Sequence, residues 1–198
     1  MIYSFVNLVS WQHFITPARN EVDRKIFFDS MSINLLAFLV TGKRIHLYSG
    51  VDYFLNQVKN AETDCFLVAN KSVRFENLFV LPQFNGMCED ELNNVDWTFI
   101  NSFKKVYIGI SSPKQEKLAE FLQKKYGMVD YFCLGAALYV KPEEFRNSKL
   151  KFLVFLKKDY RRSITKIKAT LVQILRIVFL SKIREEFREF VLKETDYS

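Results

Sequence analysis

Cysteine and histidine are scarce in this chain of 198 residues, which contains three cysteines and two histidines. Cys65, Cys88 and Cys133 are scattered, odd in number and without a Cys-x-x-Cys pair. This usage argues against a disulfide framework or a structural zinc site and favours a reducing compartment. His13 and His46 have no cysteine near them in the sequence. We therefore expect neither a metal centre that contains histidine nor a Cys–His nucleophile.

Long apolar runs are also absent. The strongly apolar runs at 35–40 and 177–180 are far shorter than the roughly 18 residues of a membrane span. The first residues lack the basic start of a secretory leader, so we expect none. At 49% hydrophobic and 16% aromatic residues, the chain can instead bury a core of its own. Its length predicts one domain with a small appendage.

The common signatures of nucleotide binding are missing. The chain has neither Gly-x-Gly-x-x-Gly nor the Gly-x-x-x-x-Gly-Lys-Ser/Thr loop. It also lacks an Asp-x-Asp pair, the motif that holds the divalent ion on the diphosphate of a sugar nucleotide in many transferases. A nucleotide diphosphate bound here would therefore need helix dipoles and side chains in place of a metal.

Basic charge is present, and it is concentrated near the C-terminus. Residues 1–140 contain 14 basic and 14 acidic side chains, whereas residues 141–198 contain 15 and 8 and supply the net charge of +7. A basic segment at 146–168 has nine basic residues against Asp159 alone. This distribution predicts a polyanionic partner, either an anionic membrane surface or nucleic acid. Nucleic acid is disfavoured because aromatic side chains are not interleaved with these charges as stacking requires.

Short apolar runs alternate with helical patterns along the first two thirds of the chain. We expect strands over 2–9, 64–69, 78–81, 106–110 and 129–134, and helices over 17–28, 31–40, 50–59 and 113–125, with helical turns over 89–94. This alternation predicts an α/β fold, a Rossmann-like, largely parallel sheet with helices on both faces.

The character of the sequence changes after Pro142. Residues 164–193 contain no glycine or proline, and their apolar residues recur at spacings of three and four. The apolar positions are Ile164, Ile167, Leu171, Ile174, Leu175 and Val178. This pattern predicts one long amphipathic helix. We therefore divide the chain into an α/β catalytic-type domain at 1–141 and a basic helical appendage at 142–198.

A strand, a tight loop and a helix are expected around 109–117. Ser112 suits an N-cap, Pro113 the first helical position, and Gln115 the third position of a capping box. A helix N-terminus at the carboxyl end of a strand is where α/β folds bind phosphates. The alternative is an ordinary capping box whose Lys114 and Glu116 are solvated.

Two further polar residues lie where strands are expected to end. Asp29 precedes the helix at 31–40, where it could be an N-cap or a general base at the edge of the sheet. Asn7 lies near the end of the first strand, where it could bond its own loop or contact a ligand.

Five segments follow one another in the order and spacing of a known motif series. They are Phe5-Val6-Asn7, Asp29-Ser30, Ser49-Gly50-Val51-Asp52, Gly109-Ile110-Ser111-Ser112-Pro113-Lys114-Gln115-Glu116 and Leu134-Gly135-Ala136-Ala137. Over nearly the whole chain this series resembles the WecG/TagA/CpsF family of bacterial glycosyltransferases. Pro-Lys-Gln-Glu is the most specific match, and the other segments support it by context.

The resemblance implies an inverting, metal-independent transferase without a cofactor. It would move a sugar from a UDP-sugar to a polyprenyl-diphosphate-linked acceptor in the synthesis of a cell-surface polysaccharide. By the family pattern, Asp29 would be the catalytic general base, and Asn7 and Gln115 would contact the donor. The remaining residues assigned to the substrate site are Ser112, Lys114, Glu116 and Gly135, and those assigned to the diphosphates are Arg161 and Arg162.

The resemblance also implies a cytoplasmic protein that lies on the inner face of the bacterial cell membrane. The basic segment at 146–168 would contact anionic lipid, no nucleic acid would be bound, and an oligomer is compatible with the sequence. The sequence departs from the family where Asp-Gly has become Asp29-Ser30 and where Phe-Asp has become Ala137-Leu138. These departures suggest an alternative, a catalytically inactive relative that acts as a scaffold for polysaccharide assembly at the membrane surface.

Overall fold

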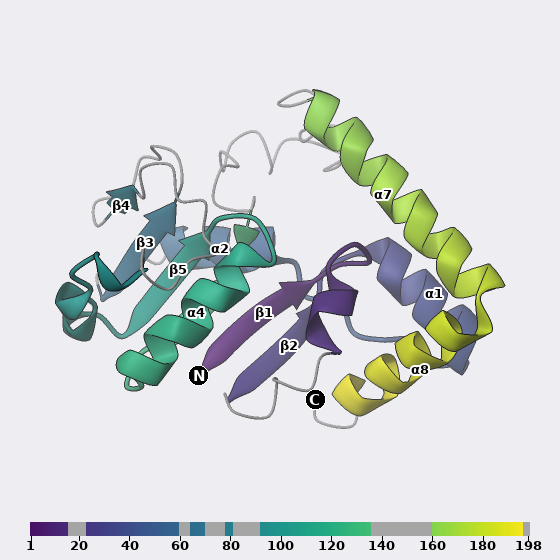
Figure 1. Cartoon of the computed structure of the whole chain (residues 1–198), viewed down its shortest axis with the longest axis horizontal. Coiled ribbons are helices and arrows are strands. Elements are labelled where there is room, and N and C mark those ends of the chain that lie inside the picture. Colours follow the sequence, from purple (N-terminus) through teal and green to yellow (C-terminus); the bar gives the residue numbers. More distant parts are fainter. Residues whose placement is uncertain (16–22, 60–63, 70–77, 81–91, 136–159, 196–198) are drawn as a thin grey trace. The chain divides into compact units, whose positions relative to one another are not determined.

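The computed structural model describes residues 1–15, 23–59, 64–69, 78–80, 92–135 and 160–195 (Figure 1). The strands are β1 (Ile2–Val6), β2 (Arg24–Phe28), β3 (Cys65–Ala69), β4 (Leu78–Val80), β5 (Lys105–Gly109) and β6 (Asp130–Cys133). The helices are η1 (Trp11–Phe14), α1 (Met31–Thr41), α2 (Gly50–Lys59), η3 (Thr98–Ser102), α4 (Lys114–Lys125), α7 (Tyr160–Phe179) and α8 (Ser181–Thr195).

The six strands form one sheet in the order β2-β1-β6-β5-β3-β4. Strand β1 is parallel to β6, β6 to β5, β5 to β3, and β3 to β4. At the start of β1 the Ile2 N–H donates to the Asp23 carbonyl at 2.9 Å, and at its end the Val6 carbonyl accepts from the Asp29 N–H at 2.8 Å. Strands β1 and β2 therefore run in the same direction. The expected Rossmann-like α/β fold with a parallel sheet and a C-terminal helical part is confirmed.

The chain forms two compact units. The first contains Met1–Phe5, Pro17–Phe27 and Ser49–Tyr139, and the second contains Val6–Thr16, Phe28–Tyr48 and Val140–Ser198. The C-terminal helices thus belong to the same unit as α1 and the segments that follow β1 and β2. This division cuts across the boundary at 141/142 that we expected from the sequence.

In the first unit, helices cover both faces of the sheet. Leu118, Ala119 and Leu122 of α4 pack on one face in a cluster with Ile108 and Tyr131. On the other face, aromatic rings stack across the strands and against α2. The ring of Phe132 lies 4.5 Å from that of Tyr3 and 5.1 Å from that of Tyr53. Figure 1 shows α4 and α2 on opposite sides of the sheet. Alternate residues of each strand therefore point into two separate layers.

The core of the second unit is aromatic. The ring centroid of Trp11 lies 5.0 Å from that of Phe187 and 6.0 Å from that of Phe190. Phe190 also meets Phe28 edge to face at 5.8 Å. Such edge-to-face pairs add to the free energy gained by burying the rings. Helix α8 is thereby fixed against the residues that follow β1 and β2.

The helix expected over 17–28 is wrong where the structure describes it. Residues Arg24–Phe28 form β2, and residues 17–22 lie outside the described residues. The reason is cross-strand packing, because Phe27 stacks on Tyr3 and Phe5 of β1 while Ile26 and Phe28 are buried on the other face. The helical turns expected over 89–94 also lie partly outside the described residues, which resume at 92.

The single long helix expected over 164–193 is also wrong, because the chain turns at Leu180 between α7 and α8. The side chain of Arg184 donates to the carbonyls of Ile177, at 3.3 Å, and of Val178. These bonds satisfy carbonyls that the end of α7 leaves without partners in the helix. The turn lets Phe187 and Phe190 of α8 reach the aromatic core. Within the described ranges, no helix has the length and apolarity to cross a membrane.

Candidate functional site

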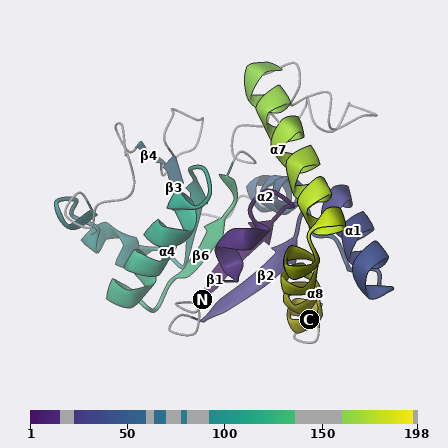
Figure 2. The same cartoon turned by 45° about the vertical axis from the view of Figure 1, so that its right-hand side comes forward.

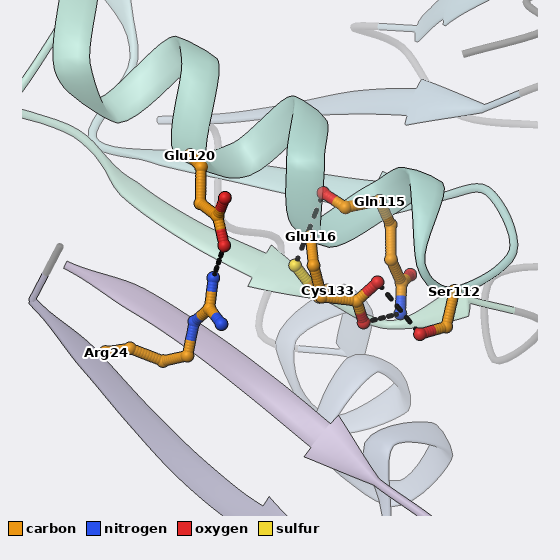
Figure 3. Close-up of polar contacts among 6 residues, drawn as sticks. All are labelled: Arg24, Ser112, Gln115, Glu116, Glu120 and Cys133. Carbon is orange, nitrogen blue, oxygen red and sulfur yellow. Dashed lines mark hydrogen bonds and ion pairs between the residues drawn. The ribbon is translucent and has the colours of Figure 1, made fainter. Parts of the chain in front are cut away.

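Three hydrogen bonds join Ser112, Gln115, Glu116 and Gly135, and one of them ties the start of α4 to the residue that follows Leu134, just beyond β6. Figure 3 shows the two bonds among Ser112, Gln115 and Glu116. The hydroxyl of Ser112 donates to Oε2 of Glu116 at 2.9 Å, and Nε2 of Gln115 donates to Oε1 of Glu116 at 2.8 Å. The backbone N–H of Gly135 donates to Oε1 of Gln115, also at 2.8 Å. We call these four residues the polar cluster. It brings together four of the residues that the sequence assigned to the substrate site.

The polar cluster is almost closed to solvent, since Gln115 is 4% exposed and Glu116 is 5% exposed. Burial raises the pKa of the Glu116 carboxyl, and this effect outweighs several that lower it. The lowering contributions come from hydrogen bonds of Gln115, of the backbone N–H of Glu116 itself and of Ser112, and from the charge of Arg24. Glu116 is therefore held by neighbours at the base of the loop and does not face solvent as a free anion.

The capping box expected at Ser112 is wrong. The N-cap position of α4 is Pro113, and the structure records no side-chain cap there. The carbonyl of Ser111 accepts from the N–H groups of Lys114, at 3.0 Å, and Gln115, at 3.4 Å. Because these N–H groups bond to Ser111, the Ser112 hydroxyl turns to the Glu116 carboxylate instead.

A third amide of the first turn of α4 is bonded as well. The Lys117 N–H donates to the Pro113 carbonyl at 3.2 Å. A phosphate at this helix N-terminus would need the same N–H donors. In this conformation they are bonded within the chain, so a phosphate here would depend on Lys114, whose side chain is half-buried.

Sequence reasoning missed two residues that border the polar cluster (Figure 3). Arg24 of β2 has a side chain only 6% exposed and forms an ion pair with Glu120 of α4. The Sγ atom of Cys133 donates to the Gln115 carbonyl at 3.7 Å, and burial raises the pKa of this thiol. The signal for Arg24 was its position two residues before the buried Ile26, which places both on the same face of the strand. That position is informative only once 24–28 is known to be a strand.

Asn7 lies in the second unit, at the turn that follows β1. Its Oδ1 accepts from the N–H groups of Val9, at 2.9 Å, and Ser10, at 3.2 Å. The Asn7 N–H in turn donates to the hydroxyl of Ser10 at 3.1 Å. Of the two roles considered for Asn7, the bonding of its own loop is the one observed.

Asp29 is half-buried in the same unit, between β2 and α1. The N-cap of α1 is Ser30, whose Oγ accepts from the Ile33 N–H at 3.3 Å. Of the two roles considered for Asp29, the N-cap is therefore wrong. Its backbone N–H is used by the Val6 carbonyl, which ties the residue to the end of β1.

Arg161 and Arg162 belong to the first turn of α7, and their side chains lie outside what the structure describes. Residues 146–159 of the basic segment lie outside it too. Within the described ranges, no group of three or more His, Cys, Asp and Glu side chains is arranged to hold a metal ion.

Sheet topology gives the order of the remaining residues. Asp29 follows β2, Asn7 follows β1, Gly135 comes just after β6, and Gln115 follows β5. These four strands are consecutive neighbours in the sheet. In open parallel sheets, ligands bind beyond the carboxyl ends of the strands.

Comparisons of the chain with protein-family models, with curated proteins and with solved structures found no match. The resemblance to the WecG/TagA/CpsF family therefore rests on the quoted motifs alone.

Proposed function

We propose that this chain is an inverting glycosyltransferase that moves a sugar from a UDP-sugar to a polyprenyl-diphosphate-linked acceptor without a metal. The observation that supports this most is the sequence of polar residues after the neighbouring strands β2, β1, β6 and β5. Asp29 follows the first of these strands and Gln115 the last. Asp29, Asn7, Gly135 and Gln115 belong to four of the five segments in which the sequence resembles the family.

In the proposed reaction, Asp29 is the general base. Its carboxylate takes the proton of the acceptor hydroxyl while that oxygen bonds to the anomeric carbon of the donor sugar. The bond from the anomeric carbon to the diphosphate breaks, and UDP leaves with the electron pair. Because the new bond forms opposite the one that breaks, the configuration at the anomeric carbon inverts. A positioned base of this kind contributes about 10²–10⁴-fold to a rate.

The polar cluster acts in this proposal by fixing the loop after β5. Gln115 uses its oxygen for Gly135 and its amino group for Glu116, so it positions backbone instead of reaching into solvent. Lys114, at the edge of the cluster, would neutralise the donor diphosphate. Arg161 and Arg162 would do the same for the donor or the lipid carrier. The basic segment at 146–168 would hold the protein on anionic lipid at the inner face of the cell membrane.

A second function is favoured by one observation. The side chains of Asn7 and Gln115 are bonded within the chain, as expected of residues kept for structure. A catalytically inactive relative that serves as a membrane-surface scaffold in polysaccharide assembly would have such a site. This alternative predicts lipid binding without transfer.

The test is release of UDP from a panel of UDP-sugars, in EDTA, with a short-chain polyprenyl-diphosphate-sugar in detergent as acceptor. We expect turnover by the native chain and its loss, by at least about 100-fold, in Asp29→Asn. Asp23→Asn is the matched control, because Asp23 is exposed at the other end of β2. Equal turnover of the two variants would remove Asp29 from the mechanism. No turnover with any donor would favour the scaffold.

A further inference from the structure

Helix α1 has no charged residue along its whole length. One side is buried in the second unit through Ile33, Leu36 and Ala37. The other side exposes four large apolar side chains, which we call the α1 apolar face: Met31 at 76%, Leu35 at 60%, Phe38 at 44% and Leu39 at 65%. Helices that are apolar all round are normally buried on every side. The exposed half of α1 is therefore a hydrophobic patch of the kind that marks an interaction surface.

The α1 apolar face is a continuous stripe with a basic end. Met31, Leu35 and Leu39 are spaced by four residues and so lie above one another on the helix. Exposed Lys43 and Arg44 follow the helix, and the Arg44 guanidinium lies 5.7 Å from the ring centre of Phe38.

Helix α7 of the same unit has a similar character. Figures 1 and 2 both show α1 beside the carboxyl-terminal end of α7. Leu175, Val178 and Phe179 near that end are 54%, 41% and 74% exposed. Lys166 and Lys168 are exposed in the amino-terminal half of α7. Neither α1 nor α7 contains an acidic residue. Exposed apolar side chains without carboxylates, next to lysine and arginine, are the composition of helices that lie in a lipid interface.

We propose that the α1 apolar face inserts into the interfacial region of an anionic lipid bilayer. An eleven-residue helix is about 16 Å long. It is too short to cross a hydrocarbon core of about 30 Å, so it would lie in the plane of the surface. Lys43 and Arg44 would then meet lipid phosphates. A second copy of this chain fits less well, because it would bring together two chains that each have a net charge of +7.

This insertion is separate from the electrostatic contact expected of the basic segment at 146–168. Only the purpose that we give to this insertion rests on the proposed function. Asp29 lies two residues before the start of α1, so an inserted α1 would hold the base at the surface where a lipid-linked acceptor presents its sugar. Binding to lipid does not itself require catalysis.

The first experiment measures sedimentation with sucrose-loaded vesicles of phosphatidylcholine and phosphatidylglycerol. It is run at low salt and in about 0.5 M NaCl, which screens surface charges and leaves apolar insertion as the main attraction. We expect Leu35→Glu to bind at least about tenfold more weakly than the native chain in high salt. Met128→Glu is the matched control, because it adds the same charge at a side chain that is 98% exposed in the first unit. Its binding should not change.

The second experiment places a reporter on the face. Trp11 and Trp97 are both fully buried, so the fluorescence of a Phe38→Trp variant that responds to lipid comes from the new side chain. We expect a shift to shorter wavelength on vesicles and quenching by brominated phosphatidylcholine. Equal high-salt binding of Leu35→Glu and Met128→Glu, without quenching, would overturn the proposal. So would a native dimer in light scattering that Leu35→Glu dissociates.

Failure here can be told apart from failure of the proposed function. If insertion occurs but the chain is not a transferase, Asp29→Asn and the native chain bind vesicles equally and neither releases UDP. If the chain is a transferase that does not use α1, Leu35→Glu retains native binding to vesicles and native release of UDP with the detergent-solubilised acceptor.

Discussion

The polar cluster of the first unit and the α1 apolar face of the second depart from the usual distribution of residues in opposite ways. Gln115 and Glu116 are polar and buried, whereas Leu35 and Leu39 are apolar and exposed. Buried polar groups and exposed apolar patches are the placements that carry information about a protein. The buried polar groups form hydrogen bonds with one another, so contacts within the chain account for their burial. Contacts within the chain do not account for the exposure of Leu35 and Leu39, so these side chains indicate a binding partner outside the chain.

The largest expected difference lies between the inner and outer sides of the second unit. Phe187 is fully buried against Trp11, so Phe187→Ala should lower the free energy of unfolding by about 3–5 kcal/mol. Leu35→Ala removes an exposed side chain and should change it by less than about 0.5 kcal/mol. Urea unfolding monitored by tryptophan fluorescence measures both. Similar costs would show that α1 is covered within the chain itself.

The next effect tests whether the polar cluster is structural. Gln115→Ala removes the acceptor of the Gly135 N–H and the donor to Oε1 of Glu116, and it should cost about 1–3 kcal/mol. Amide exchange at Gly135 should speed up. Asn101→Ala, at an exposed amide side chain of the same unit, is the control and should cost less than about 0.5 kcal/mol. A Gln115→Ala variant as stable as this control would mean that the cluster does not hold the loop.

A smaller effect concerns the backbone at the edge of the polar cluster. Gly135 has φ of 54°, and a Cβ there would lie 3.6 Å from Oε1 of Gln115, an ordinary contact. Gly135→Ala should therefore cost only the strain of a left-handed backbone, about 1–2 kcal/mol. Gly127→Ala is the control, because Gly127 has no such φ and its added Cβ would meet the Gln123 carbonyl oxygen at 3.4 Å. A thermal melt that ranks the two variants the other way would contradict this account.

The smallest effect is a change in pH dependence. Burial raises the pKa of Glu116, so the folded protein keeps this proton over a pH range in which the unfolded chain has lost it. The contribution of Glu116 to stability is therefore greatest below the unfolded pKa of about 4.3 and declines as pH rises through the folded pKa. Glu116→Gln should flatten this decline in urea titrations taken upward from about pH 4. Exposed Glu189→Gln should leave it unchanged.

Much of the fold could be predicted from local pattern. The apolar runs predicted β3 and β5, and the helix expected over 31–40 is confirmed as α1, which ends at Gly42 with a left-handed backbone and an N–H bond to the Phe38 carbonyl. These features depend on a few neighbouring residues. The identity of β2 depends instead on the rings of Tyr3 and Phe5, which are distant in the sequence and outweigh the helical spacing of its apolar residues.

The candidate site was less predictable, because hydrogen-bond partners compete. Ser112 and Gln115 match a capping box, but the Ser111 carbonyl and the Glu116 carboxylate take the partners that the box requires. The spacing of residues does not reveal which acceptor is nearer. The apolar period of α7 was read correctly, but nothing in the period indicates that this side of the helix is exposed.

Cys133 offers a way to measure how often α4 separates from β6. Its thiol is buried and touches the Gln115 carbonyl, and its raised pKa keeps it in the unreactive protonated form. An alkylating reagent can reach it only when β6 and α4 separate, so the rate at which this one sulfur gains mass counts those separations. Peptide mass spectrometry reads this rate at Cys133 in the native chain, so no substitution is needed.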